Sequence, residues 1–324
     1  MIGRREFITL IGGAAAWPSI VHAQSPSKVW RIGVLETQSI TLNANFDAFR
    51  NALRELGYVE GRNLNIEYRS ADGRAERFPE LANDLLGLNL DVLVTRGTPA
   101  VLAAKRLTTT TPIVMASTGD PLMVVTSLAH PGGNVTGLSN YYTDLEAKRT
   151  EVLKELVPGA SRIACLYNMG NPVFTSAWNQ AQATGRKLGI ETELLDIRKP
   201  EDIAPAFDTA SANRVGAIIV AIDALTQENR VVIVKLAADH RLPAMYGGRE
   251  FTAAGGLITY APNFADMYRR AASYVDKIFH GASPSDLPVE QPTRFELIIN
   301  LKAAKAIDLT LPPLLLARAD EVIE

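Results

Sequence analysis

Two short, continuous apolar runs with a helical segment between them constrain the fold of this chain more than any other feature. The runs are DVLVT (91–95) and PIVMA (112–116), each ends in a polar loop, and a helix is expected over 100–107. Uninterrupted apolar runs of this length suit strands covered on both faces, as in a parallel sheet. Ligands of open α/β sheets collect at the carboxyl ends of such strands, so both loops are candidate binding loops.

The same alternation of strand and helix runs through the whole chain and predicts parallel sheets with right-handed crossovers. Further strands are expected at 29–35, 64–68, 162–167, 190–196, 217–222, 243–246, 257–260 and 295–300. Further helices are expected at 46–56, 78–86, 176–188, 203–211, 229–240, 267–280 and 301–307. In each half a helix, a glycine stop and a strand follow one another, at Gly57 and again at Gly189, which indicates a weak internal repeat.

A chain of 324 residues is long for one domain. We therefore expect an α/β protein of two Rossmann-like lobes. If the helix at 267–280 packs on the first lobe, the chain crosses between the lobes three times, near 139–143, 261–265 and 289–294. The N-terminal lobe is then 29–139 plus 264–290, and the C-terminal lobe is 140–263 plus 291–324.

The N-terminus has the pattern of an export signal over residues 1–23. Arg4 and Arg5 precede an apolar run at 8–16, and Val21-His22-Ala23 resembles a cleavage site. The paired arginines are similar to a twin-arginine signal, and the alternative is a buried N-terminal helix. We expect a mature chain that begins near Gln24 outside the cytoplasm. With Cys165 as its one cysteine it forms no internal disulfide.

Charge and motif content argue against several classes of function. The 33 basic and 35 acidic residues give a net charge of −2, which offers no electrostatic case for nucleic acid. The sequence has no phosphate-binding G-x-x-x-x-G-K-S/T motif and no G-x-S-x-G nucleophile motif. The four histidines lack the spacing of metal ligands. We therefore expect no enzymatic activity, no metal and no cofactor.

The polar residues at the predicted strand ends are the candidate ligand contacts. In the first lobe these are Glu36, Thr37, Gly97, Thr98, Ser117, Thr118 and Asp120. In the second they are Asn168, Asn171, Asp223, Tyr246 and Tyr260.

Each candidate has a structural alternative. Thr98 precedes one expected helix, and Ser117 and Thr118 precede another that would start near Leu122. Free N–H groups at helix N-termini bind carboxylates, but the same residues serve as helix caps. Asp120 and Asp223 are placed to hold an ammonium group, or to start a turn or cap a helix.

Four tyrosines lie near expected hinges or strand ends, namely Tyr141, Tyr142, Tyr246 and Tyr260. They offer rings for stacking on an aromatic ligand, or are core and hinge aromatics.

Two other features have expected roles outside the ligand contacts. Arg96 follows a strand, and we expect it to face solvent; the alternative is that it pairs with an acid. Gly132, Gly133 and Gly137 are expected in turns with positive φ that lead into the first crossing.

Several phrases of the chain resemble one family. They are STGDP, SLAHPGGNVTGLS, LKELVPGASRIACLYN and INLKAAKAIDLTLPPLLLARADEVIE. As a set they are similar to the substrate-binding proteins of ABC transporters whose known ligands include tryptophan and tyrosine, with the type I periplasmic binding protein fold. The resemblance covers residues 29–324.

The resemblance implies a monomeric periplasmic protein that closes on a small molecule and delivers it to an ABC permease. An aromatic amino acid, or an aromatic or other carboxylic acid, is the expected ligand. A sensory module that presents its closed form to a receptor is the alternative. An enzyme is the other alternative function.

Overall fold

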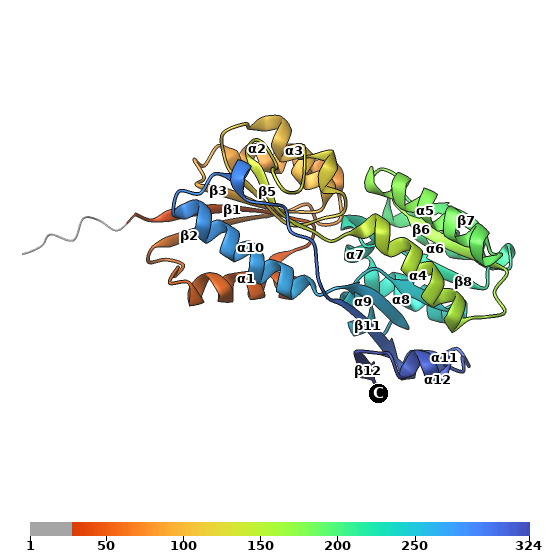
Figure 1. Ribbon diagram of the computed structural model, residues 1–324. Helices are drawn as coiled ribbons and strands as arrows, with labels where there is room; N and C mark the ends of the chain where they lie inside the picture. Colours follow the sequence, from red (N-terminus) through yellow and green to blue (C-terminus); the bar gives the residue numbers. More distant parts are fainter. Residues whose placement is uncertain (1–27) are drawn as a thin grey trace, which may run out of the picture.

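The computed structural model describes residues 28–324, so the expected export signal at 1–23 lies outside the described residues. Five parallel strands form the N-terminal sheet (Figure 1). They are β1 (Trp30–Glu36), β2 (Leu64–Ser70), β3 (Val92–Arg96), β4 (Ile113–Thr118) and β5 (Val135–Ser139). Their order is β2-β1-β3-β4-β5. Every residue of β3 and β4 is buried, as the two apolar runs predicted.

Helices cover both faces of this sheet because alternate strand residues point to opposite sides. The helices are α1 (Ala44–Glu55), α2 (Phe78–Leu86), α3 (Thr98–Leu107) and α10 (Phe264–Phe279). Val94 packs among residues of α1 and α10 on one face. Its neighbour Leu93 packs among residues of α2 and α3 on the other. Both faces are therefore apolar, which explains the uninterrupted hydrophobic runs.

The C-terminal sheet repeats this plan and extends it (Figure 1). Its strands are β6 (Arg162–Tyr167), β7 (Glu191–Asp196), β8 (Ala217–Val220), β9 (Ala244–Tyr246), β10 (Ile258–Pro262), β11 (Phe295–Asn300) and β12 (Glu321–Ile323). The order is β7-β6-β8-β9-β10-β11-β12, in which only the β10–β11 pair is antiparallel within the described chain. The first five strands therefore follow the order of the N-terminal sheet.

Helices also flank the second sheet. They are α4 (Tyr142–Leu156), α5 (Val173–Leu188), α6 (Ile203–Ala212), α7 (Ala224–Glu228), α8 (Arg230–Asp239), α9 (Arg249–Ala253), α11 (Leu301–Ala306) and α12 (Pro313–Leu316). Residues of α4 and α5 pack on one face, and residues of α6, α8 and α9 pack on the other.

The chain crosses between the lobes three times. It leaves the first lobe between β5 and α4, and it returns between β10 and α10, whose side chains join the core with α1. The third crossing follows α10, where Leu138 and Glu290 form a parallel bridge before β11 begins. α10 lies beside α1 in Figure 1. The two-lobed α/β fold expected from the sequence is confirmed.

The structure differs from the sequence-based predictions at three places. The helix expected near Leu122 is a single 3-10 turn (Pro121–Met123), because the segment after it turns back through Pro131 and two glycines with positive φ. Gly137, expected in a turn before the first crossing, lies in strand β5. Helix α4 was not predicted, because its buried face includes Glu146 and Arg149, which mask the apolar spacing.

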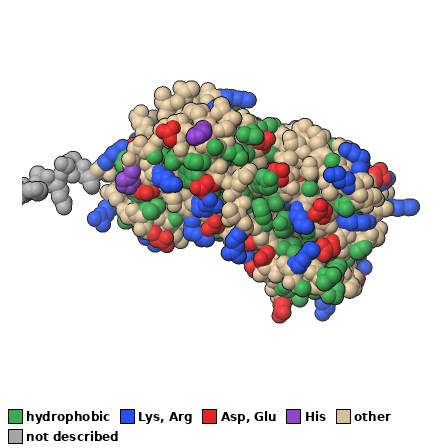
Figure 2. All heavy atoms as spheres, in the orientation of Figure 1, with side chains coloured by type: hydrophobic (Ala, Val, Ile, Leu, Met, Phe, Trp, Pro, Cys, Tyr) green, Lys and Arg blue, Asp and Glu red, His purple; other side chains and the backbone are tan. Residues whose placement is uncertain are grey.

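The positive φ expected at the glycines before the first crossing is confirmed at Gly132, Gly133 and Gly137. The charged side chains show no single-sign region on the face seen in Figure 2, where basic and acidic groups are interspersed over both lobes. Within residues 28–324 no helix has the length and hydropathy that a bilayer crossing requires.

Candidate functional site

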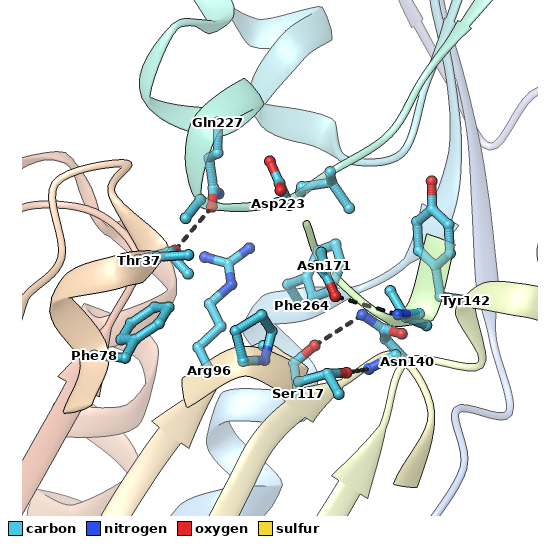
Figure 3. Close-up of a pocket in the computed structure, with 18 residues that line it drawn as sticks. Thr37, Phe78, Arg96, Ser117, Asn140, Tyr142, Asn171, Asp223, Gln227 and Phe264 are labelled. Carbon is cyan, nitrogen blue, oxygen red and sulfur yellow. Dashed lines mark hydrogen bonds between the residues drawn. The ribbon is translucent and has the colours of Figure 1, made fainter. Parts of the chain in front are cut away.

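A pocket lies between the two lobes at the carboxyl ends of their central strands (Figure 3). It holds about 550 Å³ of space outside protein atoms, the solvent at its mouth included. The loops after β1, β3 and β4 form one wall, and the loops after β6 and β8 form the other. These loops flank the positions where the strand order reverses, which is where ligands bind in open α/β sheets.

Arg96 is the only basic residue among the described residues that line this pocket. It ends β3, its side chain is 5% exposed, and its guanidinium extends into the space between the walls (Figure 3). Nη2 lies 3.5 Å from Oε1 of Glu250, whereas Nη1 is buried and has no hydrogen-bond partner in the described part of the chain. The guanidinium carbon is 5.1 Å from the ring centre of Phe264. The expectation that Arg96 faces solvent was wrong.

A buried carboxyl group lies behind this arginine. Glu36 accepts a hydrogen bond from the hydroxyl of Tyr268 and another from the backbone N–H of Thr37. Burial raises the pKa of Glu36 above its ordinary value, although the nearby Arg96 charge opposes that effect. Arg96 therefore lies close to carboxyl groups of both lobes, Glu36 in the first and Glu250 in the second.

Hydroxyl and amide groups surround the arginine on the first wall. The hydroxyls of Thr98 and Thr118 are 3.1 Å apart, and the N–H of Gly119 donates to Thr98 Oγ1 at 3.2 Å. Asn140 Nδ2 donates to Ser117 Oγ at 3.1 Å, and Asn140 Oδ1 is buried without a partner among residues 28–324. Because α4 starts only after Asn140, this amide belongs to the first crossing. The wall thus presents polar groups that local hydrogen bonds hold in place.

The second wall centres on Asp223 and Asn171. Asp223 is the N-cap of α7, where Oδ1 accepts the backbone N–H of Thr226 at 3.0 Å. Burial raises the pKa of Asp223 above its ordinary value, while that hydrogen bond and one from the side chain of Asn168 oppose the shift. Asn171 Oδ1 accepts from the N–H of Val173 at 3.4 Å.

Apolar side chains complete the pocket and come from both lobes. Aromatic rings are contributed by Phe78 and Phe264 from the first lobe and Tyr142 from the start of α4, and Val173 and Ile222 add aliphatic surface. Ligand pockets commonly pair such apolar walls with a few fixed polar groups. The arrangement suits a flat apolar body with one anionic end.

Half of the predicted ligand contacts line this pocket: Thr37, Gly97, Thr98, Ser117, Asn171 and Asp223. The others are placed behind the lining or elsewhere. Glu36, Thr118 and Asn168 support lining residues through the hydrogen bonds above.

The remaining three predicted contacts have other neighbours. Asp120 caps the 3-10 turn, with Oδ1 accepting from Leu122 N at 3.0 Å. Tyr246 stacks on Phe251 with ring centres 4.9 Å apart and lines a different cavity of the C-terminal lobe. The ring of Tyr260 packs against Phe295.

Other lining residues did not stand out as contacts in the sequence. Arg96 follows a buried strand directly, which was a usable signal. For Asn140, Gln227 and Phe264 the sequence gives no such signal, because they reach the pocket only through the way the two lobes come together.

The lobes contact each other directly beside the pocket. Thr37 Oγ1 donates to Gln227 Oε1 at 3.1 Å, and Asn45 Nδ2 donates to Glu250 Oε1 at 2.9 Å. Among the described residues, no group of three or more His, Cys, Asp and Glu side chains is arranged to hold a metal ion.

Two lobes of this strand order, three crossings and a pocket between them define the type I periplasmic binding protein fold. Residues 32–323 match the model of the family described as ABC transporter substrate binding protein, and the chain belongs to that family. Both expectations from the sequence are confirmed.

Individual relatives agree with this assignment. The chain is 25% identical over 263 residues to a tyrosine-binding protein of Clostridioides difficile (strain R20291), a match that covers 81% of this chain and 75% of the relative. A conserved domain protein of Vibrio cholerae has 28% identity and a TM-score of 0.86, over 91% of this chain and 100% of that one. An ABC domain from Streptococcus pneumonia, solved with L-Trp, has 25% identity and a TM-score of 0.84, over 91% and 99%.

Proposed function

We propose that this substrate-binding protein captures an aromatic carboxylate between its lobes and delivers it to an ABC permease. One observation carries the choice of ligand: Arg96 is the one basic group among the described residues of a partly aromatic lining, and its buried Nη1 has no partner within residues 28–324. An unmade hydrogen bond of a buried charged group is costly, and a ligand carboxylate would remove that cost. Phe78, Tyr142 and Phe264 would contact the ring.

Asp223 is the reason to keep an aromatic amino acid as the second candidate. It lines the wall opposite Arg96, and an ammonium group could reach its carboxylate while Arg96 holds the carboxylate of the same ligand. Its capping role on α7 already uses one oxygen. The tyrosine-binding and L-Trp-bound relatives support this candidate.

The same proposal includes the route and the division of the chain. We propose that residues 1–23 direct export to the periplasm, where the mature protein acts as a monomer. The lobes are proposed to be 29–139 plus 264–290 and 140–263 plus 291–324. Packing of α10 against α1 supports that division.

Calorimetry with matched ligands tests the proposal. L-tryptophan, indole-3-propionate and tryptamine share one ring and differ in the carboxylate and the amine, and the corresponding tyrosine series repeats the comparison. We expect both carboxylates to bind and the bare amine to bind at least tenfold more weakly. If L-tryptophan also binds tenfold more tightly than indole-3-propionate, the amino-acid candidate is preferred. Equal affinity for amine and acid, or no binding in either series, would overturn the carboxylate proposal.

A further inference from the structure

One carboxylate oxygen connects the two lobes beside the pocket. Glu250 lies in α9, which packs on β10, β11 and α8 of the C-terminal lobe. Its Oε1 accepts from Asn45 Nδ2 of helix α1 at 2.9 Å and lies 3.5 Å from Arg96 Nη2 of β3, so both of these partners belong to the N-terminal lobe. Gln227 Nε2, in the same lobe as Glu250, donates to the same oxygen at 3.3 Å.

We propose that Glu250 and Asn45 form a latch that holds the lobes closed and fixes Arg96 in position for the ligand. This proposal rests on the proposed function, since it assigns these two residues to capture in the same pocket. Neither residue lines the pocket, so each acts through Arg96 and through closure, not by touching the ligand. Both are positioning residues.

The geometry divides the guanidinium of Arg96 between two tasks. Nη2 faces Glu250, and Nη1 has no hydrogen-bond partner among residues 28–324. A planar guanidinium donates to two acceptors at once with little further loss of side-chain freedom. A ligand carboxylate would therefore bind Nη1 while Glu250 of the C-terminal lobe holds Nη2 of the same side chain.

Opening of the cleft would break some of the contacts of Glu250 and keep others. It separates Glu250 from Asn45 and from Arg96, because they belong to different lobes, but it leaves the contact with Gln227 intact. The latch therefore stabilises the closed state only. A ligand that binds the closed state more tightly shifts the population in the same direction.

Matched variants test the latch in two independent measurements. The variants are Asn45→Ala and Glu250→Ala, with Asn51→Ala as control, since Asn51 lies on the same helix but is exposed and accepts from Arg54 alone. Spin labels at Glu55→Cys and Val232→Cys report the distance between lobes without ligand. Cys165 is buried and will not take a label. Stopped-flow mixing with L-tryptophan and indole-3-propionate reports the rate of ligand release.

We expect Asn45→Ala and Glu250→Ala each to lengthen the interlobe distance and to speed release about tenfold, with association little changed. A tenfold change corresponds to about 1.4 kcal/mol, which is close to the smallest effect expected from the loss of one hydrogen bond to a charged group. The double variant should be no worse than Glu250→Ala, and Glu250→Gln, which keeps an acceptor for Asn45, should recover part of the closure.

Two results would overturn the latch. One is an Asn45→Ala protein with the interlobe distance of the Asn51→Ala control. The other is a double variant whose effects simply add. The distance measurement needs no ligand, so it judges the latch even if neither probe binds to the wild type, an outcome that would count against the proposed function instead.

Discussion

Replacing Arg96 by methionine gives the sharpest test of how the pocket recognises its ligand. The substitution keeps an unbranched side chain of similar reach over the ring of Phe264 and removes the one basic group of the lining. Hydrogen bonds to charged groups contribute about 1.5–3 kcal/mol each, and a tenfold change in affinity corresponds to about 1.4 kcal/mol. We therefore expect indole-3-propionate to bind about 10- to 150-fold more weakly to Arg96→Met than to the wild type.

The specificity of the loss matters more than its size. Tryptamine has no carboxylate, so its weak affinity should change by less than threefold in Arg96→Met if the arginine acts through that group. Arg96→Lys keeps the charge but cannot serve two acceptors at once. We expect it to recover part of the affinity for the acid. Isothermal titration calorimetry at pH 7 measures all three proteins with both ligands.

Folding must be measured in parallel, because Arg96 also compensates the charges of nearby carboxyl groups. Urea unfolding followed by circular dichroism shows whether each variant is folded under the binding conditions. An equal loss for acid and amine in a folded Arg96→Met protein would refute the reasoning. So would an unchanged affinity for the acid.

Three further predictions concern the scaffold. Gly137→Ala places a Cβ 2.3 Å from the backbone oxygen of Met115, whereas Gly133→Ala, at a similar positive φ, meets nothing within 4 Å; in urea unfolding the first should cost about 1–3 kcal/mol more than the second, and equal costs would contradict the packing argument. Burial raises the pKa of Cys165, so a thiol reagent should react with it only after unfolding, and fast reaction with the native protein would count against a closed core. Burial raises the pKa of Glu36, so the folded state binds this proton more tightly than the unfolded state does, and the contribution of Glu36 to stability falls as pH rises above about 4.5. Glu36→Gln should therefore gain stability relative to wild type across that rise in urea unfolding, and a pH-independent difference would contradict it.

The sheets were predictable because strands buried on both faces leave an unmistakable apolar run. β6 and β11 begin and end at the predicted residues, and the central strands of both lobes differ by one or two positions. Helix α4 escaped prediction for the opposite reason, since it buries charged side chains whose partners come from β6 and β10. Such partners lie far away in the sequence and cannot be predicted from the local spacing of residues.

The pocket was predictable in part for a similar reason. Strand ends identify the edge of a sheet where a ligand binds, and this located Thr98, Ser117 and Asp223. It does not tell which polar residue faces the pocket and which supports it from behind, as Thr118 does. The burial of Arg96 was not predictable, because the groups around it are far away in the sequence. They are the rings of Phe264 and Tyr268 in α10 and the carboxylate of Glu250 in the second lobe.

The place of α10 in the chain has a consequence for how the protein is synthesised. The helix completes the core of the first lobe against α1 and β4, yet it follows β10, the fifth strand of the second sheet. When the ribosome has made the chain only as far as residue 139, one apolar face of the first lobe, which includes Phe46 and Phe49, still lacks the helix that covers it. That face stays open until most of the second lobe has emerged. The core of the first lobe is therefore complete only after residues 264–279 have been made.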